Sequence, residues 1–286
     1  MLVPVAAAVA SLVLAGPAAA SFIVGRNASA VTLDADGEGH ALVTFVSEGQ
    51  PQRVLVWDAV NARPPSRTTP QVEFRVNFSG PPRGTVHNSC KPVKLNLGWL
   101  VTACRAIDGS YWALQSWQRT LPNNGRPPTP AQAAFELRVS HWSGPPPSLV
   151  VNWGWAYHRF RQIFGLYTYD GSGVFGYRVL PTGQPLDTYG RNIYVDALDS
   201  DIGKGWKRVN SFLAHQPIGA FCYGFFPHGG HTGVGRQMRA TAIGPGVTPD
   251  VFWQGTPPSA YSADADKQAD AEMTSLLKGD KLCRPR

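Results

Sequence analysis

The feature that most constrains the fold of this chain is a stretch that occurs twice. Residues 40–82 (HALVTFVSEGQPQRVLVWDAVNARPPSRTTPQVEFRVNFSGPP) and residues 98–146 (GWLVTACRAIDGSYWALQSWQRTLPNNGRPPTPAQAAFELRVSHWSGPP) carry similar residues in the same order. A colinear series of this kind, with gaps only where turns are expected, indicates an internal duplication. The shared residues are Leu42-Val43-Thr44 and Leu100-Val101-Thr102, Trp57 and Trp117, Asn61 and Asn124, Arg63-Pro64-Pro65 and Arg126-Pro127-Pro128, Glu73 and Glu136, Arg75-Val76 and Arg138-Val139, and Ser79-Gly80-Pro81-Pro82 and Ser143-Gly144-Pro145-Pro146.

Each copy predicts a three-stranded antiparallel meander. In the second copy, residues 98–105 and 110–119 are rich in aromatic and aliphatic side chains, and Asp108-Gly109 between them suits a tight hairpin turn. The proline-rich connection that follows cannot join a ladder, because proline lacks the amide donor. Residues 135–140 then alternate apolar and polar side chains, as residues 72–78 do in the first copy, and this period predicts a half-buried strand.

The duplication also separates scaffold from possible chemistry. Residues that occupy equivalent places in two copies are explained more simply by folding than by catalysis. We therefore expect any active site in the unrepeated segment, residues 153–235.

The remainder of the chain predicts further strands, a polar loop over residues 198–208 and one helix. Ser262 is placed to cap a helix over residues 263–278, and we expect this helix to pack on a sheet edge. Asp36-Gly37 reads as a hairpin turn; the alternative is a calcium loop built on the nearby carboxylates. The expected strands are 149–157, 165–169, 174–179, 189–197, 209–213, 219–226, 235–243 and 251–254, and the helix face expected to be buried is Ala265, Ala269, Met273, Leu276 and Leu277.

Composition agrees with a turn-rich β protein. The chain has 286 residues, 30 of them Gly and 25 Pro, with 11% aromatic and only 16% charged residues. We expect an all-β fold, either one large sandwich or two packed β lobes, with the single helix near the C-terminus. The expected division is residues 1–20 as a signal peptide, 21–147 as the duplicated half and 148–286 as a second β half, with one continuous domain as the alternative.

The N-terminus and the cysteines predict export. Residues 1–20 are uncharged and largely apolar and end in Ala18-Ala19-Ala20, which is typical of a secretory signal cleaved after Ala20. An uncleaved anchor through Val24, the only expected membrane contact, is the alternative. The four cysteines predict two disulfides, for which we favour Cys90–Cys104 and Cys222–Cys283, with a free nucleophilic Cys222 as the competing reading. The expected location is secreted or in the cell envelope.

Charge favours an anionic partner. The formal net charge is +7, and residues 53–94 carry seven basic against two acidic side chains. The basic residues are scattered arginines rather than a run, so we do not expect a nucleic acid. Flat aromatic rings stack on sugar faces, and the function we favour is non-catalytic binding of an anionic or carbohydrate polymer. The candidate ligand-binding residues are Trp153, Trp155, Trp206, Tyr189 and Arg191.

A secreted hydrolase with a site in residues 187–235 is the alternative. Asp196, Asp199 and Asp201 are candidates for an acid/base pair or a calcium site, although a solvated loop with local charge balance is the commoner explanation of such a cluster. His228 and His231 are candidate metal ligands, with His215 or His158 as a third. Signatures of familiar hydrolases, redox proteins and nucleotide-binding proteins are absent, so we expect no cofactor and the sequence assigns no reaction.

Several segments carry a resemblance to other proteins. They are LVT at 100–102 with DGSYWALQSWQR at 108–119, YGRN at 189–192, FCYGFFP at 221–227 and IGPGVTPD at 243–250. In these the chain resembles a group of uncharacterised exported proteins from high-GC bacteria, to which no activity is assigned. The resemblance implies export and identifies no functional residue.

Overall fold

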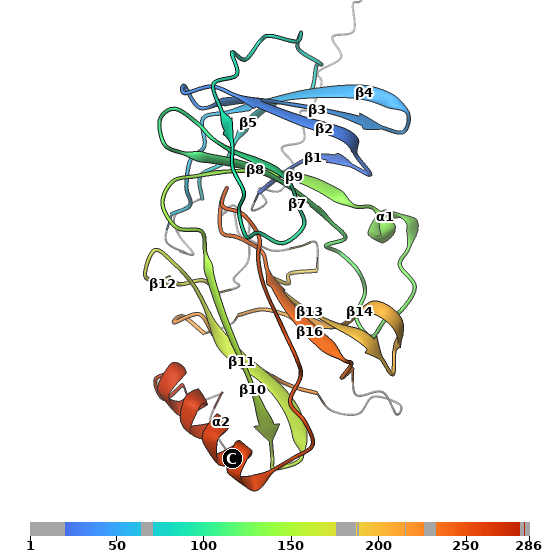
Figure 1. The fold of residues 1–286 in the computed structure, drawn as a ribbon, viewed down its shortest axis with the longest axis vertical. Helices are drawn as coiled ribbons and strands as arrows, with labels where there is room; N and C mark the ends of the chain where they lie inside the picture. Colours follow the sequence, from blue (N-terminus) through green and yellow to red (C-terminus); the bar gives the residue numbers. More distant parts are fainter. Residues whose placement is uncertain are drawn as a thin grey trace, which may run out of the picture.

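The computed structural model describes residues 21–63, 71–175, 187, 189–214, 216–225, 233–280 and 283. Antiparallel sheets dominate, and a helix of several turns lies near the C-terminus (Figure 1), so the all-β prediction is confirmed. The expected signal peptide, residues 1–20, lies outside the described residues. In the described part of the chain, no helix is long and apolar enough to cross a membrane.

The first half forms a β-sandwich, here the N-terminal sandwich. Its core lies between two sheets and includes Val43 and Val56 from one sheet and Leu114, Leu137 and Val139 from the other. One sheet has the order β2 (Ser29–Ala35), β3 (His40–Ser47), β4 (Gln50–Trp57) and β5 (Arg75–Asn77); the other has the order β1 (Phe22–Arg26), β9 (Glu136–Trp142), β8 (Tyr111–Trp117), β7 (Leu100–Arg105) and β6 (Lys91–Pro92).

The two copies adopt the same backbone path, one in each sheet. Copy one is the meander β3-β4-β5 and copy two is β7-β8-β9. In the first hairpin Leu42 pairs with Leu55, and the equivalent Leu100 pairs with Gln115, in each case two residues before the shared tryptophan. The predicted three-stranded meander is therefore confirmed in both copies. The register of the second ladder differs, because Trp57 pairs with Arg75 whereas Trp117 pairs with Glu136, the equivalent of Glu73.

The second half forms another sandwich, here the C-terminal sandwich. Its core includes Ile163 and Phe221 from one sheet and Val195, Met238 and Ala240 from the other. The first sheet contains β10 (Ser148–Ala156), β11 (Phe160–Tyr169), β12 (Ser172–Gly173) and β15 (Ala220–Gly224); the second has the order β14 (Gly203–Phe212), β13 (Ile193–Ser200), β16 (Gln237–Ala242) and β17 (Val251–Gly255).

The expected polar loop at 198–208 was wrong. Strand β13 continues to Ser200 and β14 begins at Gly203, so this stretch is a hairpin whose turn contains Asp201. Its charged residues suggested a loop because they stand on the exposed end of the hairpin, where strand residues can face water on both sides. Of the expected strand 174–179, residues 176–179 lie outside the described residues.

The predicted helix is present as α2 (Ala263–Leu276), and Ser262 Oγ accepts a hydrogen bond from the Ala265 backbone N–H. It packs on the face of a sheet rather than on an edge as expected, because Met273 and Leu277 are buried against Phe164. A single helical turn, α1 (Pro130–Ala133), lies in the proline-rich connection and was not predicted.

Both predicted disulfides are confirmed. Cys90–Cys104 joins the segment before β6 to β7, and Cys222–Cys283 joins β15 to the chain beyond α2. The free, nucleophilic form of Cys222 is thereby excluded. Two disulfides indicate an oxidising compartment.

Candidate functional site

The two sandwiches meet through polar faces of their sheets. Along β13, Ile193 and Val195 point into the C-terminal core, so the alternating residues Tyr194 and Asp196 point toward the N-terminal sandwich. The ring of Tyr194 meets the ring of Trp117 edge-on, with centroids 5.3 Å apart. Every residue of β9 is buried, so the expectation of a half-buried strand at 135–140 was wrong for β9.

Two buried side chains fix this boundary. Trp117 Nε1 donates to Asp250 Oδ2 at 2.8 Å. Gln115 Nε2 donates to the carbonyl oxygens of Gly98 (2.7 Å) and Asp250 (2.9 Å), while its Oε1 accepts from the Asp250 N–H at 2.9 Å. Every hydrogen-bonding group of the Gln115 amide is thus used, which sets the position of β8 against the C-terminal sandwich.

Asp196 holds two arginines in place. Its Oδ1 accepts from Arg208 Nε and its Oδ2 accepts from Arg239 Nε, both at 3.0 Å. Burial alone would raise the pKa of Asp196, but attraction to these two guanidinium groups lowers it instead. The carboxylate therefore stays ionised with both oxygens engaged, and its chemical role is to orient the arginines rather than to transfer a proton.

Beside Asp196 lies a pocket of about 140 Å³, here the Trp–Arg pocket. The Arg239 guanidinium lies over the ring of Trp206 at 4.3 Å and that of Trp99 at 5.0 Å, and Trp99 stacks on Trp117 at 4.8 Å. Sites for whole small molecules are usually several hundred Å³, so this pocket suits one end group of a larger ligand. It is lined by Trp99, Trp117, Gln118, Leu121, Phe135, Asp196, Trp206, Arg208 and Arg239.

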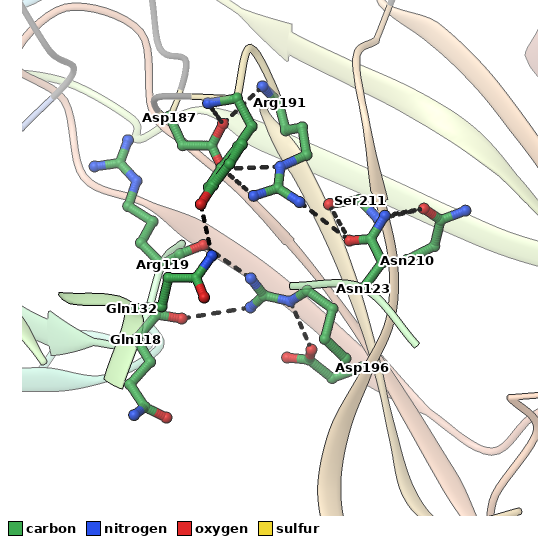
Figure 2. Close-up of polar contacts among 11 residues, drawn as sticks. Gln118, Arg119, Asn123, Gln132, Asp187, Arg191, Asp196, Asn210 and Ser211 are labelled. Carbon is green, nitrogen blue, oxygen red and sulfur yellow. Dashed lines mark hydrogen bonds and ion pairs between the residues drawn. The ribbon is translucent and has the colours of Figure 1, made fainter. Parts of the chain in front are cut away.

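A second polar network lies along the same boundary (Figure 2). Arg191 Nε donates to Asp187 Oδ2 at 2.9 Å, and its guanidinium lies over the ring of Tyr189 at 4.4 Å. Gln132 in α1 donates to the Tyr189 hydroxyl at 2.6 Å, which ties the N-terminal sandwich to the segment before β13. The network continues through Asn123, which accepts from Arg191 Nη1 (3.2 Å) and Ser211 Oγ (2.6 Å).

The structure brings some predicted residues together and separates others. Trp206 and Asp196 line the Trp–Arg pocket, and Tyr189 and Arg191 belong to the neighbouring network. The remaining predicted residues lie elsewhere. Trp153 packs on Trp253 and Phe225, Trp155 is buried beside Tyr261, Asp199 pairs with exposed Arg236, and Asp201 stands in an exposed turn, while His228, His231 and His215 lie outside the described residues.

The Asp36-Gly37 hairpin is confirmed between β2 and β3. Asp36 Oδ1 accepts from the backbone N–H groups of Glu38 and His40, both at 2.9 Å, and Oδ2 lies 3.0 Å from His40 Nδ1. Asp36, Glu38 and His40 could approach a cation together, but both oxygens of Asp36 already serve the turn.

Reasoning from sequence named only Asp196 and Trp206 as candidates and missed the other seven residues that line the pocket, among them Trp99, Trp117, Arg208 and Arg239. Trp117 was set aside as a scaffold residue because it recurs in both copies. The available signal was the alternation along β13, which places Asp196 on a single face with Tyr194. No protein-family model, curated protein or solved structure matches the chain, so functional inference depends on this geometry.

Proposed function

We propose that this protein is exported to the cell envelope or the medium and binds an anionic carbohydrate polymer without catalysing a reaction. The Trp–Arg pocket is the proposed site for one acidic sugar unit. Export is supported by the two disulfides, and an anionic partner by the net charge of +7.

The observation that carries the proposal is the position of Arg239. Asp196 engages only its Nε, and no described residue accepts a hydrogen bond from its two terminal amino groups. In the Arg208 guanidinium, in contrast, each nitrogen donates one hydrogen bond: Nε to Asp196, Nη1 to the Arg119 carbonyl oxygen (2.8 Å) and Nη2 to the Gln118 carbonyl oxygen (3.5 Å). Arg239 is therefore the donor that the pocket offers to a carboxylate or phosphate.

The aromatic rings complete the match to an acidic sugar. Trp99 and Trp206 hold Arg239 between them, and both are partly exposed in the pocket. A tryptophan face favours the CH groups of a sugar ring, while the guanidinium pairs with its acidic group. Local charge also favours an anion, since Asp196 is shared by two arginines and leaves one positive charge.

No second function is proposed, because no arrangement of described residues favours the hydrolase alternative. The carboxylate of Asp196 is engaged on both oxygens, and Asp199 forms an ion pair with Arg236 at 2.6 Å. Neither is placed beside a nucleophile or a second free carboxylate in the contacts described above.

Retention on immobilised polygalacturonate, with neutral dextran as the comparison, tests the proposal at low and physiological salt. We expect retention on the acidic polymer only, weakened by salt. Replacing Arg239→Met removes a hydrogen bond to a charged group and should weaken binding by about 10-fold or more. Trp206→Ala should also weaken it.

Arg236→Met is the matched control, because it removes the same charge from an exposed site just before β16 and Arg236 does not line the pocket. It should leave retention within about 2-fold of the wild type. Absence of wild-type retention on polygalacturonate and on anionic cell-wall material at both salt concentrations would refute the proposal.

A further inference from the structure

Arg119 lies just beyond β8 at the boundary between the sandwiches and is completely buried. Its backbone carbonyl accepts from Arg208 at 2.8 Å. Its guanidinium points away from Asp196 (Figure 2). No described residue accepts a hydrogen bond from Nε, Nη1 or Nη2. A guanidinium carries five N–H donors, and a buried cation with all of them unused is strongly unfavourable.

Arg119 does not escape this cost by losing its proton. Burial alone would lower its pKa, but the attraction of Asp250, Tyr194, Glu136 and Asp187 outweighs burial and raises it. The side chain therefore remains a cation inside the protein.

The nearby carboxylates already have other partners. Each accepts hydrogen bonds from other groups, and none accepts a hydrogen bond from Arg119. Glu136 accepts from Arg138 (2.9 and 2.7 Å), Asp250 from Trp117 Nε1 (2.8 Å) and the Gly244 N–H (3.1 Å), and Asp187 from Arg191 (2.9 Å) and the Tyr189 N–H (2.9 Å).

Asp250 is the one carboxylate in this group that no arginine pairs with, and it makes no hydrogen bond to Arg119. Among the residues named here five arginines stand against four carboxylates, and the excess positive charge is the one described for Arg239, because Arg208 and Arg239 share Asp196. The arginines are Arg119, Arg138, Arg191, Arg208 and Arg239, and the carboxylates are Glu136, Asp187, Asp196 and Asp250.

Two further buried donors lack partners on the adjoining sheet. Thr241 Oγ1 and Asn192 Nδ2 are buried without a hydrogen-bond partner. Thr241 lies directly opposite Tyr194 on β16, and Asn192 precedes Tyr194 by two residues, so both share its side of the sheet. Tyr194 is one of the groups whose field acts on Arg119. The boundary is therefore rich in donors and poor in acceptors.

We infer that Arg119 anchors a buried oxyanion site between the two sandwiches, which takes one carboxylate, phosphate or sulfate group. The anion would accept from the Arg119 guanidinium, whose N–H groups no described residue engages. It could be a free inorganic ion or the charged group of a polymer, and the inference holds whether or not the Trp–Arg pocket binds polymer.

Thermal unfolding of the full chain at pH 7 tests this site, with sodium chloride compared with inorganic phosphate, sulfate and galacturonate at equal ionic strength. An oxyanion that binds the folded state should raise the wild-type Tm by about 5–10 °C at about 100 times its Kd. Arg119→Met should lose this response, and its Tm in chloride should equal or exceed that of the wild type, because the variant removes an unpaired buried charge.

Arg236→Met is the control and should keep the full response. Equal responses in the wild type and Arg119→Met would overturn the inference, as would no response in the wild type, which is the result expected if water alone solvates Arg119. If Arg119→Met does not fold, calorimetric titration of phosphate into the wild type and Arg119→Lys decides instead, with weaker binding by the lysine variant expected and equal or absent binding contradicting the site.

Two further comparisons distinguish the Arg119 site from the Trp–Arg pocket and identify the source of the anion. Arg239→Met should lose polygalacturonate retention while keeping the phosphate response if the two sites are independent. A response to galacturonate but to neither inorganic anion would identify the site with a sugar carboxylate, whereas the reverse would identify a free ion.

Discussion

The two copies of the meander share a backbone path and differ in what covers them. Trp57 in the first copy is partly exposed, whereas its equivalent Trp117 is 2% exposed beneath the C-terminal sandwich. Arg75 pairs with Asp58 in solvent, whereas its equivalent Arg138 pairs with Glu136 inside the protein. A repeated sequence thus specifies the same strands twice, while the surface that packs against each copy decides whether its polar face is a solvated exterior or a buried site.

The copies also differ in the strand that flanks the first strand of each meander. The first copy is flanked by β2, a seven-residue strand that pairs along β3. The second is flanked by β6, which has two residues and pairs with Cys104 and Arg105 only. Cys90–Cys104 closes a loop at this short ladder and stabilises it by limiting the unfolded chain. The flanking strand of the second copy is thus held by a disulfide as well as a short ladder, whereas that of the first copy is held by a longer ladder of hydrogen bonds.

The largest expected effect comes from breaking the buried ion pair. Glu136→Gln leaves Arg138 buried without its counter-ion, because the two side chains are only 9% and 5% exposed. We expect a loss of about 3–5 kcal/mol in the free energy of unfolding, measured by urea denaturation.

The matched change in the first copy is Glu73→Gln. Burial raises the pKa of Glu73, so its charged form is disfavoured and a neutral isostere should cost less than about 1 kcal/mol. Similar losses in both copies would show that burial does not distinguish them.

The sequence was sufficient for the meanders, the disulfides and α2, because each depends on local or pairwise signals. The Asp108-Gly109 turn, the alternation in both copies and the cap at Ser262 act over a few residues. The burial of the boundary between the sandwiches, in contrast, has no local signal in the sequence. Glu136 and Arg138 stand on the polar face of an alternating strand, which reads as solvent-exposed until another sheet is known to cover it.

The site was unpredictable for the same reason. Asp196 meets Arg208 across one hairpin and Arg239 across a crossover pairing, and only the strand order β14-β13-β16 brings the three together. Trp99 and Trp117 reach this group from the other sandwich. No spacing along the chain encodes that contact.

A smaller effect should follow from pH. His141 in β9 is buried, with Nδ1 2.6 Å from the Ala59 carbonyl, Nε2 2.9 Å from Ser110 Oγ and its ring stacked on Trp112 at 3.8 Å. Burial lowers the pKa of His141 to about 4 from its usual 6.5.

Between these two pKa values the unfolded chain binds a proton that the folded protein does not. The contribution of His141 is therefore complete above about pH 6.5 and is lost as the pH falls toward 4, by about 3 kcal/mol at most. The free energy of unfolding is measured against pH for the wild type and for His141→Gln. The difference between the two curves should isolate the contribution of His141. His158→Gln, an exposed histidine in the second sandwich, should leave it in place, and a wild-type slope that persists in His141→Gln would assign it to other groups.

The smallest expected effect concerns the solvated pair of the first copy. Arg75 and Asp58 lie 3.1 Å apart with side chains 75% and 49% exposed. A double-mutant cycle with Arg75→Met and Asp58→Asn should give a coupling below about 1 kcal/mol that declines further with salt. A salt-resistant coupling of about 2 kcal/mol or more would mean that this face is shielded from water in solution. In that case a partner would cover the first copy much as the C-terminal sandwich covers the second, and the contrast between the copies would reflect two occupied surfaces instead of one.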